Sequence, residues 1–325
     1  MRSPLAWLAL TATALGASLS VPSWSAPVVI AQWRASSVLI QYVEFSPDGD
    51  RLVTADGGGT GQIWKLDGQT VAVLKGQRSP MFRAHFSGDG QSVITTGYDG
   101  TGWVWMSTGG EPLRRLQLHR AATADAYLLP PGSARTADVV SGSDDGTVVI
   151  SRADGQTLWS RQFSGTSRQL RPSQSVDLIA ASSDNGQLHL ISPSPDRRSA
   201  TVRSIQTPHG RINLIRFNPT QPEVATAGAD GTISLIPLDG QPQQRLVAST
   251  KGWSRGVAYC AGTATTILGV GDDGVLRQWS QRGQLLASLS LSPSAPLTGV
   301  DCSPSGRQAV VVNGNGQLWL LSVNP

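Results

Sequence analysis

Short apolar stretches alternate with turn residues along most of the chain. In residues 86–105 an apolar run ends at Phe86, and a Gly-Asp-Gly turn leads into a short strand expected at 92–96. A second tight turn at 98–100 then opens a strand that carries Trp105. Asp-Gly between two alternating strands favours a hairpin, because both central turn residues need positive φ. The stretch therefore predicts the middle of an antiparallel sheet.

The same pattern recurs seven times. Its turn glycines are 40–46 residues apart, at Gly59, Gly100, Gly146, Gly186, Gly231, Gly274 and Gly316. A second anchor lies 14 residues before five of them, at Phe45, Phe86, Phe217, Cys260 and Cys302. A period of about 40–45 residues with four strands is typical of a propeller blade. The repeat thus predicts an all-β fold, a seven-bladed β-propeller, where length alone would indicate about two domains.

The two ends of the repeat region complement each other. Residues 28–34 predict a strand that has no blade of its own, whereas the last blade ends after Trp319 and lacks a fourth strand. We expect the N-terminal strand to complete that blade and close the ring. Closure removes the two exposed sheet edges that an open ring would leave.

Three short motifs add a family resemblance. Residues 45–49 (Phe-Ser-Pro-Asp-Gly), 141–146 (Ser-Gly-Ser-Asp-Asp-Gly) and 209–213 (His-Gly-Arg-Ile-Asn) resemble motifs of the WD-repeat family, and the likeness spans about residues 27–323. The terminal Trp-Asp pair is absent, since Trp64 and Trp105 are followed by Lys and Met. The resemblance implies a propeller that binds or scaffolds other molecules and is not an enzyme.

The resemblance also implies a buried polar network inside individual blades. Transferred position by position, it survives in blades five and two, as His209, Thr226 and Asp230, and as Thr95, Asp99 and Trp105. Such networks satisfy buried polar groups and stiffen a blade. We assign these residues a structural role and no catalytic one.

The first 25 residues predict a secretory signal peptide. Arg2 supplies a positive start, residues 5–19 are uncharged and mostly apolar, and Ser23-Trp24-Ser25 offers small residues for cleavage after Ser25. The apolar run is shorter than the ~20 residues that span a bilayer, which favours cleavage over a retained anchor. We expect a mature domain at 26–325 that is secreted or periplasmic, with no stable membrane span and no nucleic-acid partner.

Two cysteines remain in that oxidising setting. Cys260 and Cys302 occupy equivalent positions, and equivalent sites on neighbouring blades should point the same way. A bridge needs Cα atoms within about 7 Å, so we expect buried thiols, with a disulfide as the alternative.

No enzyme motif fits its required context. The four histidines fall in different blades without metal-ligand spacing. Residues 252–256 match Gly-x-Ser-x-Gly, but they lie between two strands and not in a strand-turn-helix. We therefore expect no cofactor, no metal and no catalytic residue.

Two alternative functions remain open. Residues 153–159 resemble one repeat of a quinoprotein propeller, so such an enzyme is one alternative; an envelope-assembly factor is another.

Arginine recurs in the loops that join one blade to the next. We single out Arg78, Arg120, Arg168, Arg211 and Arg255, with Trp253 and Tyr98 on the same predicted face. Each arginine could pair with a turn aspartate such as Asp99 or Asp273. Alternatively, the guanidinium groups could surround the channel mouth and bind a protein or anionic ligand. We expect a monomer in which Arg211 approaches Asp230 and Arg255 contacts the partner.

Overall fold

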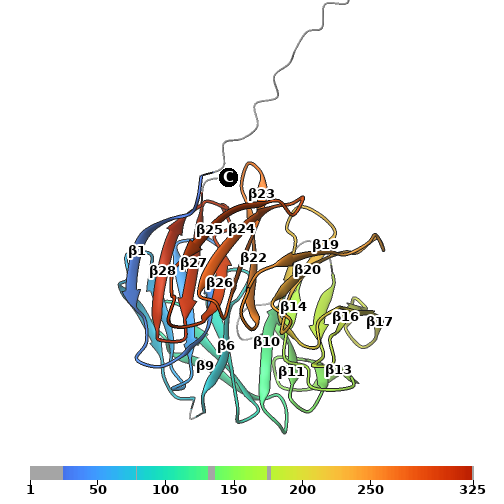
Figure 1. Ribbon diagram of the computed structural model, residues 1–325. Helices are drawn as coiled ribbons and strands as arrows, with labels where there is room; N and C mark the ends of the chain where they lie inside the picture. The colour runs from blue at the N-terminus through green and yellow to red at the C-terminus, as the bar shows by residue number, and fades with distance from the viewer. Residues whose placement is uncertain (1–24, 78, 131–135, 174–176, 324–325) are drawn as a thin grey trace, which may run out of the picture.

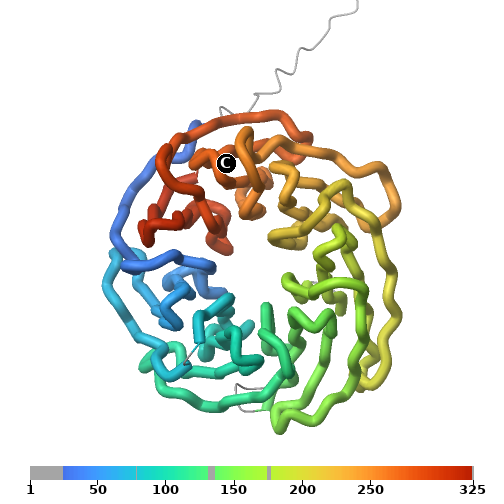
Figure 2. Tube along the Cα trace, turned by 60° about the horizontal axis from the view of Figure 1, so that its bottom comes forward, coloured from blue at the N-terminus to red at the C-terminus, as the bar shows by residue number. Residues whose placement is uncertain are grey.

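The computed structural model describes residues 25–77, 79–130, 136–173 and 177–323, and we discuss those residues only. They form seven antiparallel sheets of four strands each, arranged in a ring around a central axis (Figures 1 and 2). No helix occurs in the described residues. The predicted seven-bladed β-propeller is confirmed.

Six of the seven blades are built from four consecutive strands. In every blade the first strand of its repeat lies nearest the axis, where it contacts the first strands of neighbouring blades. Blade one comprises β2 (Ile40–Phe45), β3 (Arg51–Asp56), β4 (Gly61–Lys65) and β5 (Thr70–Leu74). Blade two comprises β6 (Met81–Phe86), β7 (Ser92–Gly97), β8 (Thr101–Met106) and β9 (Pro112–Gln117). Blade three comprises β10 (Thr123–Leu129), β11 (Asp138–Ser143), β12 (Thr147–Ser151) and β13 (Thr157–Gln162). Blade four comprises β14 (Leu170–Pro172), β15 (Ile179–Ser182), β16 (Gln187–Pro193) and β17 (Ala200–Gln206).

Blade five comprises β18 (Ile212–Phe217), β19 (Glu223–Gly228), β20 (Thr232–Pro237) and β21 (Gln244–Val247). Blade six comprises β22 (Ser254–Ala261), β23 (Thr265–Gly271), β24 (Val275–Ser280) and β25 (Leu285–Ser290). Blade seven comprises β26 (Leu297–Cys302), β27 (Gln308–Asn313) and β28 (Gln317–Ser322), and its outer strand is β1 (Val28–Arg34) from the other end of the chain. β1 pairs antiparallel with β28 from Val28↔Ser322 to Arg34↔Gln317 and lies beside it in Figure 1. The N-terminal strand therefore closes the ring, as predicted.

The turn glycines fix the path of the chain from blade to blade. All seven have φ between 72° and 82°, a conformation that side-chain-bearing residues rarely adopt. The carbonyls of six of them accept hydrogen bonds from the next blade-joining loop, for example Gly100 from the His119 N–H at 3.1 Å and Gly231 from the Ser249 N–H at 2.9 Å. These hairpins and the blade-joining loops thus share one face of the ring.

Polar side chains inside the blades form the expected hydrogen-bonded networks in part. The Trp105 indole N–H donates to Thr95 Oγ1 at 2.9 Å, and Gln77 occupies the place of a histidine by accepting from that hydroxyl at 2.9 Å. Asp99 lies in its own turn and accepts from Thr101 Oγ1 at 2.7 Å. In blade five, His209 contacts Asp230 Oδ1 at 2.8 Å and Thr226 Oγ1 at 3.1 Å.

The expectation of two free thiols is wrong, because Cys260 and Cys302 form a disulfide with Cα atoms 5.4 Å apart. The two residues are equivalent by residue count but not by strand register. Cys302 pairs with Ala309, seven residues before its turn glycine, whereas Cys260 pairs with Thr266, eight residues before its own. Successive strand residues point to opposite sides, so this one-residue offset turns Cys260 toward blade seven.

Replacing both cysteines with serine should lower the free energy of unfolding by roughly 4 kcal/mol, since the bridge closes a loop of 42 residues. Urea denaturation of the wild type and the variant, each with and without a thiol reductant, measures the effect. The reductant should destabilise the wild type and leave the variant unchanged. An identical unfolding midpoint for oxidised and reduced wild type would contradict the assigned bridge.

Candidate functional site

One register position brings polar side chains from around the ring to the axis. It is the residue of each innermost strand that pairs with a residue six positions before the turn glycine. Blade by blade, this central ring consists of Glu44, His85, Tyr127, Arg171, Arg216, Ala258 and Asp301. Six of its seven members are polar or charged, although most neighbouring positions are apolar. The ring is therefore a distinct feature of the channel and no continuation of the core.

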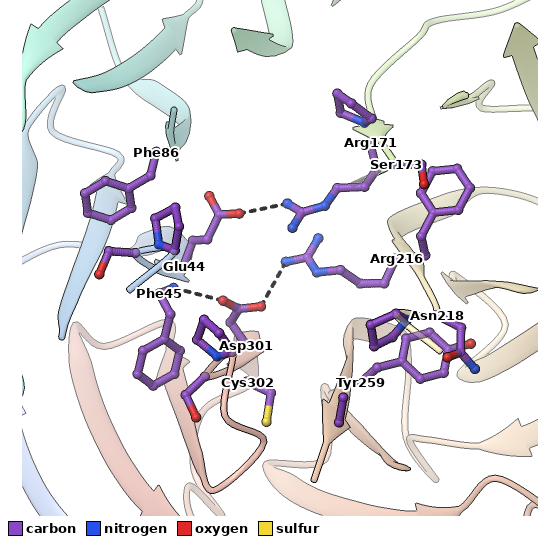
Figure 3. Close-up of a pocket in the computed structure, with 18 residues that line it drawn as sticks. Glu44, Phe45, Phe86, Arg171, Ser173, Arg216, Asn218, Tyr259, Asp301 and Cys302 are labelled. Atoms are coloured by element: carbon purple, nitrogen blue, oxygen red, sulfur yellow. Dashed lines mark hydrogen bonds and ion pairs between the residues drawn. The ribbon is translucent and has the colours of Figure 1, made fainter. Parts of the chain in front are cut away.

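Two arginines of the central ring cross the channel. Arg171 Nη1 lies 2.8 Å from Glu44 Oε1, which joins blades four and one. Arg216 Nη2 lies 3.7 Å from Asp301 Oδ1 and donates to the Tyr42 hydroxyl at 3.0 Å, which joins blade five to blades seven and one. Figure 3 shows both arginines facing the two carboxylates from the opposite side. These contacts connect blades that are not neighbours in the ring.

The remaining carboxylate oxygens extend the network around the axis. Glu44 Oε2 lies 2.9 Å from Nδ1 of His85, and Nε2 of His85 lies 2.8 Å from Asp125 Oδ1. Asp125 Oδ2 accepts the Leu170 backbone N–H at 2.9 Å. The His85 ring also stacks on Tyr127 with centroids 3.9 Å apart. The network thus joins the first four blades through buried groups.

Burial and mutual charge set the protonation of these groups. Burial opposes the charge of Glu44, but His85 and Arg171 outweigh it and lower the pKa of Glu44 from 4.5 to about 2. Burial raises the pKa of Asp301, even though Arg216 counteracts it. Burial likewise raises the pKa of Tyr42 to about 12. Of the two carboxylates that face the arginines, Glu44 is therefore the one held more firmly in its ionised form.

The innermost strands run in the same direction through the ring, so their two ends open at opposite mouths of the channel. At the mouth beside the blade-joining loops lies a cavity of about 370 Å³, which we call the arginine mouth. Five of the seven residues singled out as partner contacts line it: Tyr98, Arg168, Arg211, Trp253 and Arg255. Arg83, which the sequence analysis missed, lines it as well. Arg120 is exposed and does not line the cavity, and Arg78 lies outside the described residues.

Two arginines of this mouth pair with aspartates of the hairpin turns. Arg168 Nη2 lies 2.9 Å from Asp144 Oδ2, and Arg255 Nε lies 2.6 Å from Asp272 Oδ1. The partners are thus other aspartates than the two we named as examples, because Asp273 pairs within its own blade with Arg277 at 2.8 Å. Each of the two pairs leaves part of the guanidinium facing the cavity.

The expected approach of Arg211 to Asp230 is wrong. Asp230 is occupied by His209 and by Arg245, each at 2.8 Å. The guanidinium of Arg211 instead lies over the Trp253 ring, 5.3 Å from its centroid, and Arg255 lies over the same ring at 4.7 Å. Among the described residues Arg211 has no ion pair, and its buried Nε has no hydrogen-bond partner.

Electrostatics around Arg211 are correspondingly unfavourable for a bound cation. Burial lowers the pKa of Arg211, and the neighbouring charges of Arg168 and Arg255 lower it further, which outweighs the opposing attraction of Asp184 and Asp144. No carboxylate lines the described part of this cavity. An anion placed there would relieve the repulsion between the guanidinium groups, and the Trp253 ring would offer it an apolar surface.

The other candidate chemistries gain no support from the geometry. Within the described ranges, no three or more His, Cys, Asp or Glu side chains are placed to share a metal ion. Ser254 of the Gly-x-Ser-x-Gly match is buried at the start of β22, so the match lies between strands. Trp159 of the quinoprotein-like segment lies on the outer strand β13, and its register equivalents in blades one and five are Ala72 and Gln244. A search of the described residues for a helix long and apolar enough to cross a membrane finds none.

Replacing Glu44 with Gln should remove the acid-sensitive part of the stability. Because its pKa is lowered on folding, Glu44 stabilises the fold above pH about 4.5, and this contribution disappears as the pH falls toward 2. We expect the variant to be roughly 3 kcal/mol less stable at pH 7 and to approach the wild type near pH 2. Urea denaturation at a series of pH values tests this, with the exposed Glu111→Gln as the matched control. A constant difference between the Glu44 variant and the wild type across that range would contradict the account.

Comparisons with known proteins agree with the fold. A family described as WD domain, G-beta repeat matches residues 68–105 and 200–236. WD repeat-containing protein slr1409 of Synechocystis sp. is 37% identical over 293 residues, which cover 90% of this chain and 86% of that protein. The uncharacterized WD repeat-containing protein slr1410 of the same organism is 34% identical over 216 residues, 66% of this chain and 62% of its own length. With seven blades, repeat matches in two of them and a relative aligned along most of its length, the chain belongs to the WD-repeat family.

Proposed function

We propose that this protein is a non-catalytic binding propeller that acts outside the cytoplasm as a monomer and recognises an anionic group of a partner protein at its arginine mouth. The observation that carries the proposal is Arg211. It is a partly buried guanidinium without an ion pair among the described residues, set between two further arginines at the edge of a cavity. WD-repeat propellers generally serve as protein-interaction scaffolds, which agrees with this assignment.

Aromatic side chains give the arginine mouth the composition of an interface. The guanidinium groups of Arg211 and Arg255 both lie over the Trp253 ring, and the exposed ring of Tyr98 stacks on Phe82 with centroids 4.1 Å apart. Tyr98 is 52% exposed, so much of its ring remains accessible to a partner protein. Arginine and aromatic residues are enriched among the residues that dominate binding energies. The arginine mouth can therefore offer a partner both charge, from its guanidinium groups, and apolar contact, from its aromatic rings.

The disulfide supports a location outside the cytoplasm. Bridges such as Cys260–Cys302 persist in oxidising compartments and are rare where cellular reductants are active. This agrees with the signal peptide expected at residues 1–25, most of which lie outside the described residues. Recovery of the protein with Met1 intact from a cytoplasmic fraction would contradict export.

An acidic peptide tests the arginine mouth. We expect fluorescein-labelled hexaglutamate to bind the wild type, with an affinity that falls as salt is raised. Arg211→Gln should weaken this binding by about tenfold, because it removes a charge that forms no ion pair among the described residues. Its free energy of unfolding should change by less than about 1 kcal/mol for the same reason. Fluorescence anisotropy and urea denaturation provide the two measurements.

The matched control is Arg198→Gln, an exposed arginine in the turn between β16 and β17. It should leave hexaglutamate binding unchanged. Binding that is insensitive to salt, or that the two arginine variants weaken equally, would refute the arginine mouth as the site. A large loss of stability in Arg211→Gln would show that this residue has a structural role instead.

A further inference from the structure

The opposite mouth of the channel holds a second cavity, of about 310 Å³, which we call the ion-pair mouth. Its floor is the central ring, which contributes Glu44, Arg171, Arg216 and Asp301. Its rim is formed by the hairpins that follow the innermost strands and by the rings of Phe86, Phe217 and Tyr259 near the ends of those strands. A cavity of this size that combines aromatic rings with a few convergent polar groups is typical of a small-molecule site.

The two carboxylates and the two guanidinium groups of this floor lie on opposite sides of the channel, which we call its two walls. Asp301 on β26 and Glu44 on β2 belong to the adjacent blades seven and one. Arg171 on β14 and Arg216 on β18 belong to the adjacent blades four and five on the other side, as Figure 3 shows. Carboxylates and guanidinium groups are equal in number, so the floor favours neither a simple cation nor a simple anion. A molecule that carries both charges can instead align with the two walls.

Both walls retain unused hydrogen-bonding capacity. Arg171 uses Nη1 for Glu44 and for the Tyr127 hydroxyl, while its Nε and Nη2 make no hydrogen bond in the described residues. Asp301 Oδ2 accepts the Phe45 N–H at 2.9 Å, whereas Oδ1 accepts no hydrogen bond from the described residues and lies 3.7 Å from Arg216 Nη2. A free donor group and a free acceptor atom therefore remain on opposite sides of the floor.

We propose that the ion-pair mouth binds a small zwitterion, namely a free α-amino acid with an apolar side chain. Its ammonium group points toward Asp301, its carboxylate points toward Arg171, and its side chain packs against the aromatic rim. This site is independent of the arginine mouth, because the central ring separates the two cavities. Each charged group of the ligand makes a charge-assisted hydrogen bond in a largely buried setting, where such bonds are strongest.

Three probes separate a zwitterion site from a general apolar one: L-phenylalanine, N-acetyl-L-phenylalanine, which lacks the ammonium group, and L-phenylalanine amide, which lacks the carboxylate. Titrated into the full chain labelled with ¹⁵N, L-phenylalanine should shift the amide signals of Ser46, Asn218 and Ser303 at the ion-pair mouth. The indole signal of Trp253 at the arginine mouth should not move. For a ligand of this size we expect a Kd of about 1 mM or tighter. Each derivative should bind at least about tenfold more weakly, since each loses one charge-assisted hydrogen bond.

A substitution locates the ammonium group. Asp301→Asn retains a carbonyl oxygen for the Phe45 N–H and removes the charge, so it should weaken L-phenylalanine binding about tenfold. Arg211→Gln at the other mouth is the matched control and should not change it. Equal affinities for the three probes, signals that move at Trp253, or no shifts at about 10 mM L-phenylalanine would overturn the proposal, and the probe comparison needs only the wild type.

Discussion

The crossing of the channel by Arg171 and Arg216 is the constraint on which the rest of the structure depends. Charges removed from water in the middle of a ring are costly unless each finds a partner. Here Arg171 meets Glu44 and Tyr127, Arg216 meets Tyr42 and Asp301, and the free oxygens of the carboxylates meet His85 or a backbone N–H. Satisfying all of them at once requires the first strands of at least six blades at fixed distances from the axis. The network therefore specifies one ring geometry in addition to stabilising it.

The same crossing divides the channel into two mouths with different chemistry. On the side of the blade-joining loops, arginines crowd around Trp253 without carboxylates in the described lining. On the other side, equal numbers of carboxylates and guanidinium groups face each other across the floor. One surface therefore favours an anionic partner, and the other favours a molecule with both charges. Closure of the ring by β1 and the Cys260–Cys302 bridge both reinforce blade seven, where the two chain ends meet.

The sequence predicts the fold well, because its strongest signal is a backbone requirement. A turn glycine with positive φ recurs every 40–46 residues between the second and third strands of successive blades, so the count of these regularly spaced turns is the count of blades. Side-chain partners depend on register, which residue counting does not provide. The β22–β23 hairpin is one residue longer than the β26–β27 hairpin, so Cys260 and Cys302 meet although their positions in the repeat suggest otherwise. The position of Arg211 was hidden for a different reason. Asp230 already pairs with His209 and Arg245, so the Arg211 guanidinium lies over Trp253 instead.

The polar character of the central ring could have been predicted from the sequence. Glu44, His85, Arg216 and Asp301 each come directly before the anchor that lies 14 residues ahead of a turn glycine. Comparing the repeats at that one position would have shown charged residues where a core strand should be apolar. Their pairing across the ring would still have been hidden, because it joins blades one and four, or five and seven, which are distant in the chain.

A double-mutant cycle on Glu44 and Arg171 tests the importance of this crossing most directly. Urea denaturation of Glu44→Gln, Arg171→Met and the double variant gives the coupling energy, and the exposed pair Asp230–Arg245 serves as reference. We predict a coupling of about 2 kcal/mol or more for the buried pair and less than about 1 kcal/mol for the exposed one. A coupling between Glu44 and Arg171 no larger than that of the exposed pair would contradict the account.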